Sequence, residues 1–135
     1  MDAFFIKITV LPFNYNTYFN VGGENMEKCH INVRINRDVK KQGEQVLAKL
    51  GLKHSSFIHM LYAQLVENKV LPFEIVNLDE KNFDDKINFK INPQIKAQSA
   101  EILNHYGLTN STFLRLSYYH LIKNQKLPFK NIGIN

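Results

Sequence analysis

Hydrophobic and polar residues alternate strictly in two short segments of the chain. Apolar side chains at every second position are typical of a β-strand that buries one face and exposes the other. We therefore expect strands over residues 30–35 and 86–91. The side chains expected on their outer faces are polar or charged: His30, Asn32, Arg34, Lys86, Asn88 and Lys90.

In both segments the alternation gives way at once to apolar residues at helical spacing. Asn36 and Asn92 are good N-caps for this first helix, and Pro93 suits its first position, where a missing N–H costs nothing. Gly51 and Gly107 are placed to end it in a left-handed conformation. The stripe expected to be buried is Val39, Val46, Leu47 and Leu50, and in the second segment Ile95, Ile102, Leu103 and Tyr106.

A second helix is expected shortly after each of these glycines. Thr109 is a natural N-cap for it, whereas Lys53 at the corresponding position is a poor one. Its apolar stripe begins at Phe57 and Phe113. We expect the Leu-Pro-Phe sequences at 71–73 and 127–129 to end it, because the residue before a proline disfavours helix.

The two segments are copies of one unit. Shifting the sequence by 56 positions aligns residues 31–73 with residues 87–129 without a gap, and 17 of the 43 aligned positions are identical. Such a unit is near the size below which a lone domain is usually unstable, so the copies are expected to share one core.

Each unit reads strand–helix–helix, and a single strand cannot satisfy its own backbone. We therefore predict a mainly α fold with a short β-ribbon, in which two antiparallel strands pair over four helices and the chain forms an intrachain pseudo-dimer. The predicted organisation is an N-terminal extension over 1–29, a first copy over 30–73, an acidic linker over 74–85, a second copy over 86–129 and a tail over 130–135.

The charge of the chain is unevenly distributed. Residues 74–85 carry five acids and one base, a net charge of −4, whereas the other residues carry 16 bases and 7 acids, a net charge of +9. A basic body with an acidic connector suits a polyanionic partner such as nucleic acid. The alternative is a solvated surface with an acidic loop.

The composition argues against several classes of protein. The single cysteine, Cys29, excludes an internal disulfide framework and fits a reducing, cytoplasmic environment. No apolar run approaches the roughly 18 residues of a membrane helix. The five histidines show no metal-ligand spacing with Cys29, and no nucleophile–base set stands out. We therefore expect neither an enzyme nor a metal or other cofactor.

The repeated unit resembles the ribbon-helix-helix antitoxins of the RelB/DinJ family. The residues that carry the resemblance run from Ile31 to Asn36, then through an apolar helix to Gly51-Leu52-x-x-Ser55 and the terminal Leu71-Pro72-Phe73, and the second copy matches them. Family members usually have one such unit per chain, followed by a segment that wraps a toxin. The resemblance implies that the paired strands enter the major groove of operator DNA. It also implies a toxin partner similar to RelE or YafQ, which are ribosome-dependent messenger-RNA endonucleases.

The outer strand residues have the chemistry of a major-groove reader. Asparagine can contact adenine in a bidentate manner, and arginine or lysine can contact guanine. We therefore predict base contacts from the six outward residues; the alternative is a polar face that keeps the strands soluble. Because His30 and Arg34 correspond to Lys86 and Lys90, we expect an operator that is only approximately two-fold symmetric.

Phosphate contacts are expected at the start of the second helices, whose free N–H groups and dipoles attract anions. Simple helix capping is the alternative there, and both roles are compatible. The residues predicted to contact phosphates are Lys53, Ser55, Ser56, Asn110, Ser111 and Thr112.

The second copy leaves only residues 130–135 after it, so the expected place for a toxin contact is the acidic linker. A toxin that cuts RNA should be basic, which motivates a weak hypothesis of toxin binding by Glu74, Asp79, Glu80, Asp84 and Asp85. A plain linker is the alternative. For the whole chain, the runner-up function is a protein-binding module that neutralises a toxin without binding DNA, and a third reading is an inactive relic of a duplicated gene.

Residues 1–25 lie outside the repeat. The sequence from Gly22 to Asn25 back-translates to a ribosome-binding sequence directly before the codon of Met26, so we expect Met26 to be a translation start. The alternative is an additional strand over residues 4–10.

Overall fold

The computed structural model describes residues 29–79 and 81–128 of the chain. The predicted translation start at Met26, the alternative strand over 4–10, Glu80 and the tail over 130–135 lie outside the described residues. The described elements are β1 (Cys29–Ile35), α3 (Arg37–Lys49), α4 (His54–Asn68), β2 (Asp85–Ile91), α5 (Pro93–His105) and α6 (Asn110–Asn124).

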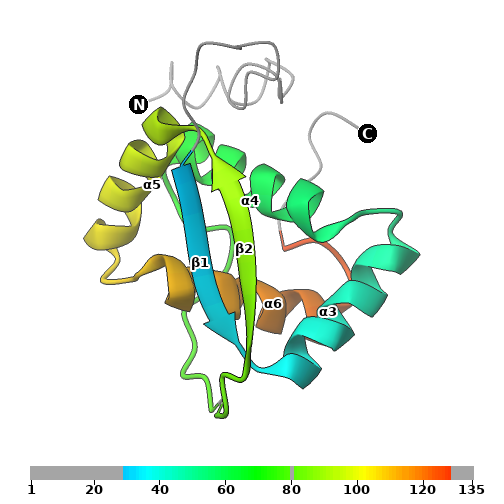
Figure 1. Cartoon of the computed structure of the whole chain (residues 1–135). Helices are drawn as coiled ribbons and strands as arrows, with labels where there is room; N and C mark the ends of the chain where they lie inside the picture. The colour runs from blue at the N-terminus through cyan, green and yellow to red at the C-terminus, as the bar shows by residue number, and fades with distance from the viewer. Residues whose placement is uncertain (1–28, 80, 129–135) are drawn as a thin grey trace.

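The two strands form one antiparallel ribbon, with the helices packed on its inner side (Figure 1). In this view α4 and α6 lie behind the ribbon, and α5 and α3 flank it on either side. The predicted mainly helical fold with a short β-ribbon is therefore confirmed. Each strand begins one residue earlier than the alternation indicated.

The register of the ribbon gives the fold its pseudo-two-fold axis. Asn32 lies opposite Asn88, with His30 opposite Lys90 and Arg34 opposite Lys86. Because Asn32 and Asn88 occupy the same position in the two copies, the axis passes through this pair. The two halves of the chain are thus arranged as the subunits of a symmetric dimer would be.

One hydrophobic core serves both copies. The inner faces of the strands are buried, as are the apolar stripes of α4 and α6, which include Phe57 and Phe113. The first helix of each copy packs mainly against the second helix of the other, α3 on α6 and α5 on α4. Neither copy therefore encloses a core of its own, which agrees with the small size of the unit.

The helix starts follow the sequence closely. The side chains of Asn36 and Asn92 each accept two backbone N–H groups at the starts of α3 and α5. Thr109 accepts the N–H of Thr112, whereas Lys53 makes no side-chain cap, as expected. Gly51 follows α3 with a φ of 76°, the left-handed conformation predicted for it.

The predicted ends of α4 and α6 are wrong. These helices stop at Asn68 and Asn124, before the Leu-Pro-Phe sequences, on Lys69 and Gln125 in the left-handed conformation with φ of 61° and 57°. The backbone N–H of each cap residue donates to a carbonyl of the last turn, which offsets the cost of this conformation for a residue with a Cβ. The expected burial of Leu50 is also wrong, since it is 40% exposed at the end of α3.

The connector between the copies is fastened to the body at both ends. Near its start, Phe73 stacks on His120 and Phe113, and His120 Nε2 lies 2.9 Å from the carbonyl oxygen of Glu74. Near its end, the Arg115 guanidinium lies 3.7 Å from the ring centroid of Phe83. The connector thus follows the surface of the folded body. None of the described helices is long and apolar enough to cross a membrane.

Candidate nucleic-acid interface

Six polar side chains cover the outer side of the ribbon, and we call this surface the ribbon face. All six are exposed: His30, Asn32, Arg34, Lys86, Asn88 and Lys90. The two asparagines lie at the centre, with a pair of basic or imidazole side chains toward each end. Alternation of the strands brings all six residues proposed for base contact onto this face.

Each second helix supports one end of the ribbon from below. Arg115 Nε of α6 donates to the backbone oxygen of Arg34 over 3.0 Å, and His59 Nε2 of α4 lies 2.9 Å from the backbone oxygen of Lys90. The two pairs are related by the repeat. These two contacts were not predicted from the sequence. They could have been suspected, because the aligned residues His59 and Arg115 both have side chains that can donate an N–H.

A depression lies beside β1, where the ribbon meets the start of α6. Three segments line it: His30 to Asn32 of β1, Lys96 of α5, and Thr109 to Ser111. It therefore joins two of the residues predicted to contact bases with two of those predicted to contact phosphates. Thr112 follows in the first turn of α6, where its N–H is already bonded to Thr109. Lys96 was not singled out from the sequence.

The start of α4 is organised differently. Lys53 and Ser55 are exposed and Ser56 is half-buried. Between them, His54 is hydrogen-bonded through Nδ1 to the hydroxyl of Tyr118, and its Nε2 lies 2.9 Å from a carboxylate oxygen of Glu44. Both ring nitrogens of His54 therefore face groups of the protein itself.

The buried tyrosines link the two copies at these helix starts. Tyr62 donates to Asn110 Oδ1 over 2.5 Å, and Tyr118 bonds His54, the residue that corresponds to Asn110. Burial raises the pKa of both hydroxyls above the usual value, and the charge of Glu44 adds to the rise for Tyr118. Each tyrosine therefore stays protonated and positions the helix start of the other copy.

Two of the acidic connector residues are paired within the chain. Asp84 accepts the backbone N–H of Arg37 over 2.9 Å, and its other carboxylate oxygen lies 3.8 Å from the guanidinium. Asp85 Oδ1 lies 3.6 Å from Lys40 Nζ. A hydrogen bond from the Lys86 N–H lowers the pKa of Asp85, and the charge of Lys40 lowers it further.

The remaining acids of the connector are Glu74, Asp79 and Glu80. Glu74 and Asp79 are exposed on the connector, and Glu80 lies outside the described residues. Of the five residues hypothesised to bind a toxin, two are therefore paired with basic residues of α3 and two are exposed. In residues 29–79 and 81–128, no group of three or more histidine, cysteine or acidic side chains could hold a metal ion.

The comparisons with known proteins agree with the repeat. The model of the RelB antitoxin family matches the chain twice, over residues 28–83 and 84–133. A search of curated proteins and a search of solved structures each found no match.

Proposed function

The chain belongs to the RelB antitoxin family, and we propose that it is the antitoxin of a type II toxin–antitoxin system that binds operator DNA through the ribbon face and regulates transcription. Membership of the family suggests the antitoxin role itself. The observation that carries DNA binding is the ribbon face, where six exposed side chains can contact bases and none is acidic. Its two-stranded form suits the major groove.

A binding titration tests this proposal. The probe is a fluorescent duplex of the DNA upstream of the gene, with fluorescence anisotropy measured between 50 and 200 mM salt. We expect affinity to fall steeply with salt, because phosphate contacts release counterions. Asn32→Ala and Asn88→Ala should each weaken binding by about 1–3 kcal/mol, the value of a bidentate base contact.

Gln45→Ala is the matched control, since Gln45 is exposed on α3 and has no part in the ribbon face. If the wild-type chain fails to bind, or if the asparagine variants bind as well as the control, operator recognition by the ribbon is wrong.

We further propose that the operator is only approximately two-fold symmetric. The central asparagines are the same in both copies, but His30 and Lys86 occupy one aligned position and Arg34 and Lys90 another. The two ends of the ribbon therefore present different donors to the bases. A footprint over a perfect palindrome, with equal losses from Arg34→Ala and Lys90→Ala, would contradict this.

Toxin binding is the second part of the proposed role. A RelE/YafQ-like toxin would be basic, and Glu74 and Asp79 are exposed acids on the connector. The test is co-purification of the tagged chain with the product of an adjacent small basic open reading frame. A double variant, Glu74→Gln with Asp79→Asn, should reduce recovery of this product, whereas Gln45→Ala should not. Unchanged recovery would exclude the connector acids.

The alternative function is toxin neutralisation without DNA binding. It predicts co-purification with the toxin together with no salt-dependent binding to the upstream duplex. The reducing environment that Cys29 fits and the operator target both favour action in the cytoplasm.

A further inference from the structure

The regions flanking the ribbon on its two sides are equivalent in the repeat but differ in charge. On one side lies the depression formed with Lys96, Thr109, Asn110 and Ser111, which we call the second-copy anchor. The aligned residues on the other side are Lys40, Lys53, His54 and Ser55, which we call the first-copy anchor.

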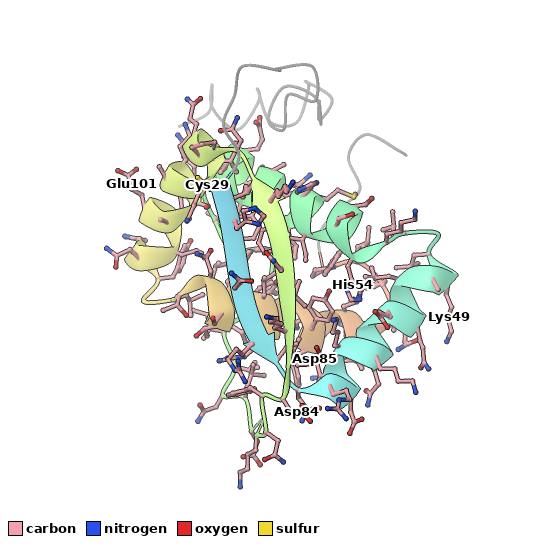
Figure 2. The ribbon with its side chains drawn as sticks, in the orientation of Figure 1. Cys29, Lys49, His54, Asp84, Asp85 and Glu101 are labelled. Carbon is pink, nitrogen blue, oxygen red and sulfur yellow. The ribbon has the colours of Figure 1, made fainter. Side chains whose placement is uncertain are left out.

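Two carboxylates occupy the first-copy anchor. Asp85 lies 3.6 Å from Lys40 Nζ, which also donates to the backbone oxygen of Lys86 over 3.0 Å. Glu44 lies 2.9 Å from His54 Nε2 at the first residue of α4. Figure 2 shows Asp84 and Asp85 together at the end of the ribbon next to α3. A phosphate approaching here would meet Lys40, which already has a carboxylate partner, and a second carboxylate beside the helix start; the exposed cation that remains is Lys53.

The second-copy anchor lacks both carboxylates. Cys29 stands in place of Asp85 and Ala100 in place of Glu44. Within the described part of the chain, no acid pairs with Lys96. Because Asn110 Oδ1 accepts the hydroxyl of Tyr62, the amide nitrogen of Asn110 remains to donate elsewhere. Lysine, amide, hydroxyl and helix start therefore converge, and among the described residues the lysine has no carboxylate partner. The acid next to this region is Glu101, which lines the neighbouring hollow with Thr109 and Asn110.

We infer that Glu44 and Asp85 make the phosphate contacts on the two sides of the ribbon unequal in strength. The second-copy anchor holds its phosphate strongly and the first-copy anchor holds its phosphate weakly, so the protein lies on the duplex in one orientation. The inference rests on the proposed DNA binding and adds to it two residues that contact no DNA. Polarity thus arises from charge at the backbone anchors as well as from the side chains of the ribbon face.

The repeat supplies a matched pair of variants for the test, Lys96→Ala and Lys40→Ala. Both remove a lysine from aligned positions in the first helices, and binding to the upstream duplex is measured as a function of salt. Lys96→Ala should reduce the slope of log affinity against log salt by about 1, which at 0.1 M salt is a loss of roughly eightfold. Lys40→Ala should change the slope by less than half as much, because Asp85 already neutralises it.

Charge-neutral variants give the reciprocal test. Asp85→Asn and Glu44→Gln keep the shape of the side chains and remove the negative charge. Each should therefore raise the affinity for the duplex several-fold. The gain from Asp85→Asn should vanish when Lys40→Ala is also present. Thermal unfolding of each variant by circular dichroism verifies that it remains folded. If the chain binds DNA but the two lysine variants lose affinity equally, or the neutral variants gain none, the inference of unequal phosphate contacts is wrong while the proposed DNA binding stands. Failure of the wild-type chain to bind overturns the proposed DNA binding itself.

Discussion

At the scale of single residues, the two buried tyrosines show how one copy depends on the other. Tyr62 and Tyr118 lie in the core, and each hydroxyl reaches the first residue of the second helix in the opposite copy. A buried hydroxyl that is hydrogen-bonded costs little, whereas an ionised phenolate in the same place would be expensive. The free energy of unfolding should therefore depend on pH in the alkaline range.

The direction of this dependence follows from the raised pKa of both tyrosines. Above pH 10 the unfolded chain releases phenolic protons that the folded chain retains, so stability is complete below pH 10 and falls as pH rises. Each tyrosine should lower the free energy of unfolding by about 1.4 kcal/mol per pH unit. Urea unfolding between pH 9 and pH 11.5 measures this slope. A double variant, Tyr62→Phe with Tyr118→Phe, that retained the full wild-type slope would contradict the assignment.

Gly43 is a second residue whose role depends on the other copy. A Cβ at this position of α3 would lie 2.5 Å from Cδ2 of Tyr118, whose side chain is fully buried and cannot move aside. Gly43→Ala should therefore destabilise the protein by about 1–3 kcal/mol, despite the better helix propensity of alanine. Thermal or urea unfolding measures the change. Ser99→Ala at the aligned position of α5 is the control, and a stabilised Gly43→Ala would refute the close contact.

Residues that act locally could be read from the sequence, and residues that act across the copies could not. Asn36, Asn92 and Thr109 cap the helices that directly follow them, so their neighbours in sequence reveal their role. Gly43 and His54 both contact Tyr118, which lies on α6 in the other copy. No local pattern distinguishes such positions from ordinary helix residues.

At the scale of elements, the start of α3 joins a helix to the connector. Asn36 Oδ1 accepts the N–H groups of Asp38 and Val39, and Asn36 Nδ2 donates to the backbone oxygens of Lys81 and Asn82 over 2.8 and 3.2 Å. One side chain thus begins the helix and holds the end of the connector.

Two substitutions of Asn36 separate these roles. Asn36→Ala removes both and should cost about 1–2 kcal/mol from the lost cap, with a further cost for the connector. Asn36→Asp keeps the cap acceptors but loses the two donated bonds, so it should be less destabilising while hydrogen exchange near Lys81 accelerates. Equal destabilisation by the two substitutions, with unchanged exchange, would contradict the dual role.

Element types and starts were predictable because strand alternation, helical spacing and caps are local signals. The ends of α4 and α6 were not, because Lys69 and Gln125 adopt a left-handed conformation that neither residue type favours. The Leu-Pro-Phe sequences appeared to be terminators but serve packing, since Leu71, Phe73 and Leu127 contact the core. For the candidate interface, the ribbon face followed from alternation, whereas the position of Lys96 in the depression beside β1 depends on tertiary contacts between α5 and the start of α6.

At the scale of the whole molecule, the shared ribbon and interlocked helices should hold the halves together without the connector. A protease site inserted after Asn77, which is exposed, allows the chain to be cut once it has folded. The cut halves should elute together on gel filtration. Their thermal midpoint should fall and become dependent on concentration, because unfolding then includes dissociation.

The uncut protein with the same insertion is the control, and its midpoint should not depend on concentration. Separation of the cut halves under native conditions would show that the copies do not rely on a common core. This prediction needs only the repeat and the small size of each unit, so the sequence already indicated it; the exchange of helix partners between copies adds the physical reason.

The axis through Asn32 and Asn88 has an evolutionary consequence. When two identical subunits pair, any substitution in the gene appears on both sides of the axis, and both half-sites of the target must change together. In this chain the aligned positions are encoded separately, so one side can change while the other keeps its contacts. Under the proposed DNA binding, the fused protein can therefore change its preference for one half-site at a time, through intermediates that keep their contacts to the other.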